Sequence, residues 1–117
     1  MKHFMVELTY TAPFERVAQF VPEHRTYLQR GYDAELLLFS GPQNPKTGGI
    51  IIARAPNIEL LQEFLAADPF QRENVASYRI VEFEAVKSQP FMKPWIDGSN
   101  NLVAPESRPA ESAATAS

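Results

Sequence analysis

The chain has 117 residues, 44% of them hydrophobic, and a formal net charge of −3, which together are typical of one small globular domain. No cluster of Lys and Arg is present to bind nucleic acid or an anionic membrane surface, so we expect neither as a partner. The absence of Cys excludes disulfides, thiolate nucleophiles and iron–sulfur clusters. No apolar stretch has membrane-spanning length and the N-terminal residues do not resemble a signal peptide, so we expect a cytoplasmic protein.

The first part of the chain predicts a strand followed by a helix. Apolar and polar side chains alternate over residues 3–10, which is the period of a half-buried strand. Pro13 suits the first turn of a following helix, and Gly31 suits its C-terminal cap. Pro22 lies inside this segment, so we expect a kink there, or a short turn with the main helix starting at Pro22. The inward face of the helix is formed by Val17, Val21, His24 and Leu28.

Three strands and one helix are expected in the remainder of the chain. A loop rich in turn-forming residues runs from Ser40 to Pro45. The second helix begins at Asn57, a good N-cap, and ends at Asp68 because a residue before proline avoids the helical conformation. The strands are expected over residues 35–40, 50–53 and 78–86.

This order of elements, β-α-β-β-α-β, predicts an α+β, ferredoxin-like fold with a four-stranded antiparallel sheet and two helices on one face. Several strands are apolar on both sides, so the face without helices needs a cover. A second copy packed sheet against sheet would supply it, which predicts a homodimer. We assign residues 1–96 to this domain. Residues 97–117 carry mainly Ser, Ala, Asn, Pro and Glu, and we expect a flexible polar tail.

Two side chains are the main candidates for chemistry. His24 faces inward on the first helix, where an imidazole can act as a general acid or base; the alternative is a packed histidine bonded to a backbone carbonyl. Asp68 lies on the inward stripe of the second helix, four residues after Phe64, where a carboxylate can fix the tautomer of an imidazole. The alternative for Asp68 is an N-cap for a turn that starts at Pro69.

Other polar residues offer further possibilities. Ser40 is either a donor to a substrate oxygen or a turn former, and Arg25 is either an anion-binding residue or a solvated side chain. Tyr10, Tyr27 and Tyr78 are expected in the core or in a pocket wall. Two His, no Cys and no closely spaced His and carboxylate ligands argue against a metal site, and no nucleotide-binding glycine motif is present. We therefore expect no metal and no cofactor.

Three short motifs, taken together, resemble the YCII-related proteins. The segment from Pro22 to Leu28, with His followed by Arg, resembles the first motif of that family. Ser40-Gly41-Pro42 resembles the loop motif after its second strand, and Asp68-Pro69-Phe70 resembles its signature at the end of the second helix. The resemblance covers residues 1–96 in the right order. It implies a dimeric ferredoxin-like fold of the α/β-barrel type, with His24 and Asp68 as the pair in the active site.

Some members of this family resemble enzymes that remove HCl from chlorinated hydroxyhydroquinones. The resemblance therefore implies a cofactor-independent lyase, a dehydrochlorinase of aromatic catabolism with a small-molecule substrate. Such chemistry suits His24 as a base held by Asp68, with Ser40 or Arg25 steadying the departing chloride or an oxyanion. Aromatic walls that include Phe39 and Trp95 would suit a flat ring. The alternatives are a non-catalytic binding module of the same fold, or an isomerase or cofactor-free monooxygenase of the related dimeric barrels.

Overall fold

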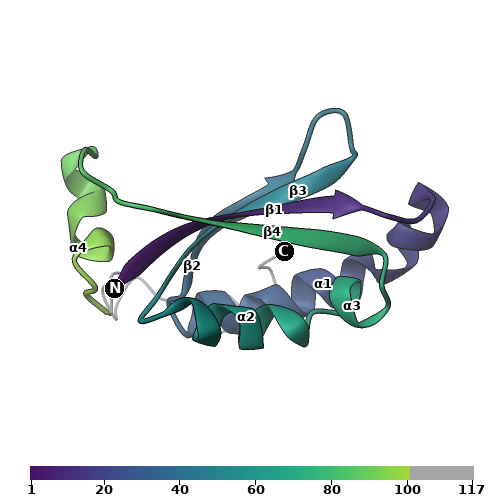
Figure 1. The fold of residues 1–117 in the computed structure, drawn as a ribbon, viewed down its shortest axis with the longest axis horizontal. Coiled ribbons are helices and arrows are strands. Elements are labelled where there is room, and N and C mark those ends of the chain that lie inside the picture. The colour runs from purple at the N-terminus through teal and green to yellow at the C-terminus, as the bar shows by residue number, and fades with distance from the viewer. Residues whose placement is uncertain (101–117) are drawn as a thin grey trace, which may run out of the picture.

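An antiparallel four-stranded sheet with helices packed on one face makes up the fold, seen here in a computed structural model that describes residues 1–100 (Figure 1). The strands are ordered β2-β3-β1-β4. Each neighbouring pair is antiparallel, which confirms the predicted ferredoxin-like fold. In chain order the elements are β1 (Lys2–Tyr10), α1 (Phe14–Asp33), β2 (Leu37–Pro42), β3 (Gly48–Ala55), α2 (Ile58–Ala66), α3 (Pro69–Arg72), β4 (Ala76–Phe83), the 3₁₀-helix η1 (Pro90–Met92) and α4 (Lys93–Ile96).

The hydrophobic core lies between the central strands and the layer formed by α1, α2 and α3 (Figure 1). On β1, Phe4, Val6 and Leu8 are buried, because alternate side chains of a strand point to the same face. Val6 lies opposite Ile51 of β3, and Phe4 lies opposite Ala53. The alternation over residues 3–10 therefore gives the correct inward face of the central strand.

The alternative of a short turn, with the main helix starting at Pro22, is wrong, since α1 continues through Pro22 from Phe14 to Asp33. Pro22 is exposed, so its ring and the carbonyl that it deprives of a partner lie on the solvent side, where water can bind that carbonyl. The buried side of the helix carries Val17 and Leu28 as predicted. His24 is therefore held on one unbroken helix together with the residues around it.

Gly31 is not the cap of α1 but a point of close packing. The helix extends past it to Asp33, and the left-handed residue that turns the chain is Glu35, with a φ of 59°. Gly31 is buried, and a Cβ atom at this position would come within 2.7 Å of Leu37 and 2.8 Å of Phe64. Any larger residue here would have to displace Leu37 or Phe64, because the start of β2 and the side of α2 both pack closely against α1.

The turn at Glu35 also shifts the second strand, which begins at Leu37 and continues to Pro42 instead of ending at Ser40. Gly41 and Pro42 pair with β3 in a strand at the edge of the sheet, where the missing N–H of proline costs no ladder hydrogen bond. The fourth strand runs over Ala76–Phe83, two residues earlier than predicted at its start and three at its end.

The opposite face of the sheet carries apolar side chains that α1, α2 and α3 do not cover. Met5 pairs with Ile52 and with Val81 on neighbouring strands, and all three side chains are partly exposed. Phe39 is 62% exposed on the same face, and Phe83 is 42% exposed. The expected uncovered sheet face is therefore present in the single chain.

One end of this face is covered by the segment η1–α4, at the left of Figure 1. Trp95 is buried there, with its ring 5.6 Å from the His3 ring and 5.2 Å from the guanidinium of Arg54. Arg54 is fully buried and donates hydrogen bonds to the carbonyl oxygens of Trp95, at 2.6 Å, and Ser99, at 2.8 Å. The predicted domain boundary at residue 96 cuts through these contacts, and most of the predicted tail, residues 101–117, lies outside the described residues.

Replacing Gly31 by Ala is expected to lower the free energy of unfolding by about 1–3 kcal/mol, because the added methyl group must displace Leu37 or Phe64. Urea denaturation followed by circular dichroism measures the loss. Gly41→Ala is the matched control, since nothing lies within 4 Å of a Cβ atom at Gly41. Equal stability of the two variants would contradict the close-packing role of Gly31.

Candidate active site

A pocket of about 320 Å³ lies between α1 and the strands β1, β2 and β3. Its floor is apolar and includes Leu8, Leu28 and Ile51, whereas His24 and Arg25 contribute polar groups from α1. A volume of this size is at the lower end of the range for sites that bind small molecules. The pocket is therefore a candidate binding site, and His24, Arg25 and Ser40 are among the residues that line it.

His24 and Asp68 are in direct contact. The Nδ1 atom of His24 lies 2.8 Å from Oδ1 of Asp68, and the Asp68 side chain is completely buried. His24 lines the pocket and retains 13% of its side-chain exposure. The contact joins α1 to the junction of α2 and α3, two segments that are 44 residues apart in the sequence.

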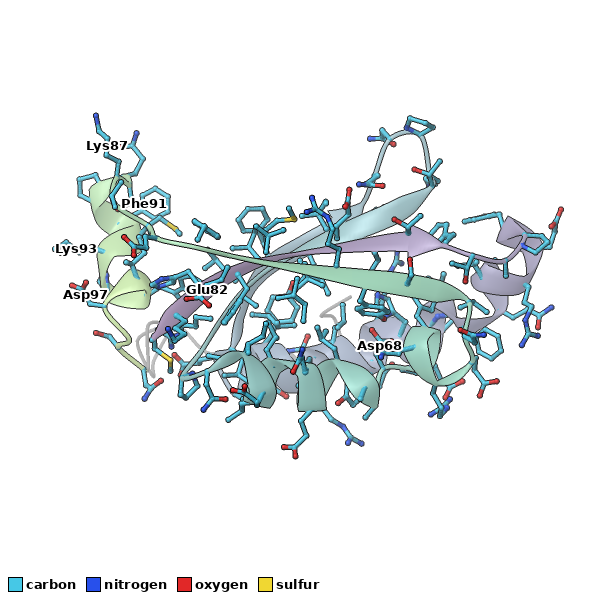
Figure 2. All side chains as sticks on the ribbon, viewed as in Figure 1. Asp68, Glu82, Lys87, Phe91, Lys93 and Asp97 are labelled. Carbon is cyan, nitrogen blue, oxygen red and sulfur yellow. The ribbon has the colours of Figure 1, made fainter. Side chains whose placement is uncertain are left out.

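Asp68 reaches His24 because it is the N-cap of α3. Its backbone is extended, with φ −63° and ψ 131°, so the chain leaves α2 and turns back toward α1 before Pro69 starts the next helix. Oδ1 accepts a hydrogen bond from the backbone N–H of Phe70 at 3.0 Å. Figure 2 shows Asp68 at this junction, between the helical layer and the sheet. The capping role and the contact with His24 therefore belong to the same carboxylate.

The bond to Asp68 determines which nitrogen of His24 is available for proton transfer. A carboxylate only accepts hydrogen bonds, so the Nδ1–H of His24 donates to it. The lone pair of the neutral ring is then on Nε2, which has no protein partner within residues 1–100. Phe70 stacks on the imidazole, with ring centroids 3.9 Å apart and ring planes at 4°. The ring is thus fixed on one side by Asp68 and on one face by Phe70.

Tyr78 on β4 completes the surroundings of Asp68 by donating its hydroxyl to Oδ2 at 2.6 Å. Burial, together with the neighbouring Asp68 charge, raises the pKa of Tyr78 far above its ordinary value of 10.0, so the hydroxyl stays protonated and remains a donor. Its expected location in the core or a pocket wall did not identify this role. The period-two spacing of β4 places Tyr78 inward, opposite Leu8, but only the folded structure shows that it reaches Asp68.

The other predicted site residues divide into two pairs. Arg25 and Ser40 line the pocket, and Oγ of Ser40 lies 2.6 Å from the hydroxyl of Tyr32. Sequence reasoning missed Tyr32, although it lies seven residues after Arg25, which places both on one side of α1.

Phe39 and Trp95 are not part of the pocket, so the prediction that they form its walls is wrong for the chain itself. Phe39 precedes Ser40 on β2 and points to the opposite face of the sheet, as successive side chains of a strand do. Trp95 belongs to α4 and is buried against His3 and Arg54 at the end of that opposite face. The aromatic ring that does contact His24 is Phe70.

The YCII-related domain matches residues 1–84 of the chain. This chain belongs to the YCII-related family. Its structure is similar to that of 5-chloro-2-hydroxyhydroquinone dehydrochlorinase (TftG) from Burkholderia phenoliruptrix AC1100, in a complex with 2,5-dihydroxybenzoquinone. The TM-score is 0.61 at 16% sequence identity, and the similarity covers 69% of this chain and 92% of that chain. No curated protein matches the chain in sequence.

Within residues 1–100 of this YCII-related protein, no group of three or more His, Cys, Asp or Glu side chains is arranged to hold a metal ion. In the same part of the chain, no helix has both the length and the apolar character needed to cross a membrane. The polar groups that the pocket does contain are donors and acceptors of the protein itself.

Replacing Tyr78 by Phe is expected to lower the free energy of unfolding by about 1–3 kcal/mol, because Oδ2 of the buried Asp68 loses its donor. Tyr27→Phe is the matched control, since the Tyr27 hydroxyl donates to an uncharged carbonyl, that of Phe64, and its loss should cost about 0.5–1.5 kcal/mol. Urea denaturation of both variants gives the comparison. A smaller loss for Tyr78→Phe than for Tyr27→Phe would contradict the role of Tyr78 as the partner of a buried carboxylate.

Proposed function

We propose that this YCII-related protein is a cofactor-independent enzyme that uses His24 and Asp68 for acid–base chemistry on a small hydroxylated ring compound. The observation that carries the proposal is the contact of a pocket-lining imidazole with a fully buried carboxylate. A packed histidine bonded to a backbone carbonyl, the alternative considered from sequence, does not fit that contact. The YCII-related fold and its structural similarity to a dehydrochlorinase support the same class of reaction.

In this mechanism His24 takes a proton at Nε2 from a hydroxyl group of the substrate. The positive charge that then develops on the imidazole is stabilised by Asp68, 2.8 Å away at the other nitrogen. Asp68 also holds the ring in the tautomer that presents its lone pair to the pocket. The imidazolium can return the proton to another atom of the same substrate, so the pair serves as base and acid in turn.

The specific reaction that we propose is the loss of HCl from a chlorinated hydroquinone. Removing a hydroxyl proton pushes an electron pair into the ring, and the chlorinated carbon takes up a proton from His24. Loss of a second hydroxyl proton then forms a carbonyl, while the C–Cl bond breaks with both electrons on chloride. One proton and one chloride leave in total, and the ring becomes a quinone. The oxidation of the ring is balanced by the reduction of its C–Cl carbon, so the reaction needs no external oxidant.

Arg25 and Ser40 are the residues we propose for substrate binding in this pocket. Each offers a donor, so either can stabilise an oxyanion or a departing chloride, as acid–base elimination requires. The apolar floor beneath them suits the flat face of a ring. A cytoplasmic location stays a prediction from the sequence.

Chloride release from a panel of chlorinated hydroquinones tests the reaction. The wild-type protein is expected to release chloride, and His24→Ala and Asp68→Asn are expected to lower kcat by about 10²- to 10⁴-fold, because the base or its orienting partner is lost. His3→Asn is the control, since the second histidine lies on the other sheet face, bonded to the carbonyl of Ile96. A ring consumed without chloride release would favour an isomerase, and no turnover with any compound would overturn the proposal.

We also propose that two copies pack through the open sheet face, which carries Met5, Ile52, Val81 and Phe39. Single chains rarely leave an apolar patch of this kind exposed to water. Phe39→Lys is expected to convert a dimer into a monomer in size-exclusion chromatography with light scattering. Phe14→Lys is the matched control, because Phe14 is 50% exposed but belongs to the start of α1. A wild-type monomer at all concentrations would contradict the dimer.

A further inference from the structure

Two donors that line the same pocket have no hydrogen-bond or ion-pair partner within residues 1–100. Among the arginines of residues 1–100, Arg25 alone makes no ion pair, hydrogen bond or ring contact; the others bind carboxylates, carbonyls or aromatic rings. Among the tyrosines of the same residues, Tyr10 alone has no hydrogen bond at its hydroxyl. Both side chains line the pocket.

Arg25 and Tyr10 are also close enough to influence each other. Burial raises the pKa of Tyr10, and the positive charge of Arg25 acts in the opposite direction. Tyr10 is in edge-to-face contact with Phe70, at 6.0 Å, and Phe70 stacks directly on His24. The two donors therefore line the same pocket as the imidazole that we propose as the base, and Phe70 lies in contact with both Tyr10 and His24.

The electrostatics of the pocket favour an anion. No Asp or Glu is among the residues that line it, and Asp68 is completely buried behind His24. A guanidinium that faces such a pocket without a carboxylate partner attracts negative charge, and a hydroxyl donor beside it adds direction. The alternative is that Arg25 is an ordinary solvated surface arginine. That alternative explains neither the lack of Asp and Glu in the pocket lining nor the Tyr10 hydroxyl without a hydrogen bond.

We propose that Arg25 and Tyr10 form a subsite for an anionic oxygen substituent, either a carboxylate or a phenolate. This substituent belongs to the ring compound on which His24 carries out acid–base chemistry. The inference rests on the proposed function for the identity of the ring, but the subsite is a binding feature and does not require turnover. The inference gives a binding role to Tyr10, which has no role in the proposed reaction. It also gives Arg25 the role of selecting anionic substrates over neutral ones.

Binding of three catechols that share one ring tests the subsite. The probes are 3,4-dihydroxybenzoate with a carboxylate, 3,4-dihydroxybenzamide as its neutral counterpart, and ionised 4-nitrocatechol with a phenolate. Calorimetric titration of the wild-type protein is expected to give at least about tenfold tighter binding of the benzoate than of the benzamide. A preference for 4-nitrocatechol over both would identify a phenolate as the preferred anion.

Variants show whether the preference comes from the two donors. Arg25→Gln is expected to remove the difference between benzoate and benzamide, and Tyr10→Phe to weaken binding of the anions by about three- to tenfold. Arg16→Gln, on the same helix but in contact with Phe20, is the control and should keep the preference. The inference is overturned if the wild-type protein binds all three probes equally, or if Arg25→Gln keeps the wild-type ratio.

The same titrations with His24→Ala separate this inference from the proposed function. The preference for an anion is expected to survive in that variant, because Arg25 and Tyr10 remain in place. If no compound is turned over but the preference depends on Arg25, the reaction is wrong and the subsite stands. If chloride is released but the preference does not depend on Arg25, the reaction stands and the subsite is wrong.

Discussion

The buried carboxylate of Asp68 is the interaction on which the arrangement of this protein depends. It accepts hydrogen bonds from His24, from the backbone of Phe70 and from Tyr78, and none of its side chain is exposed. A charge without water needs such partners, or its burial would cost several kcal/mol. The three donors come from α1, α3 and β4. The carboxylate therefore fastens the helical layer to the sheet with the same bonds that orient the candidate base.

The fold could be predicted because each element carries a local signal. The alternation of apolar and polar residues predicted β1, and the apolar stripe around Val17 and Leu28 predicted the inward face of α1. Asn57 indicated the start of α2, and its side chain does cap that helix. The inward positions of His24 and Asp68 followed from the same periodicity. Their contact did not follow, because it depends on an extended residue between two helices and on how that bend packs against α1. Capping and pairing looked like alternatives in the sequence, yet a single carboxylate oxygen, Oδ1 of Asp68, accepts both hydrogen bonds.

The mistakes about the site have physical explanations as well. Phe39 and Ser40 are neighbours on one strand, so the period of two that identified β1 also separates them onto opposite faces. Trp95 could not be located from sequence, since it packs on Arg54, a buried arginine within a strand of otherwise apolar residues. A charged residue in that position gives no sign of its burial, because arginine is seldom buried without partners and these partners lie far along the chain. Gly31 was likewise predicted as a helix cap because its true constraint comes from distant parts of the chain. The side chains that leave no room for a Cβ atom at Gly31 belong to β2 and α2.

Arg54 also joins the matched family domain to residues that follow it in the chain. It lies inside the part of the chain that matches the family domain, residues 1–84, but two of the carbonyls that it binds belong to Trp95 and Ser99. A chain cut at the end of that match would keep the guanidinium in β3 and lose both acceptors, together with the indole that covers it. The family match and the hydrogen bonds of Arg54 thus cover different lengths of the chain. Among the residues that the structure describes, the contacts of Arg54 therefore extend the folded unit at least to Asn100, whose side chain also accepts a hydrogen bond from Arg54.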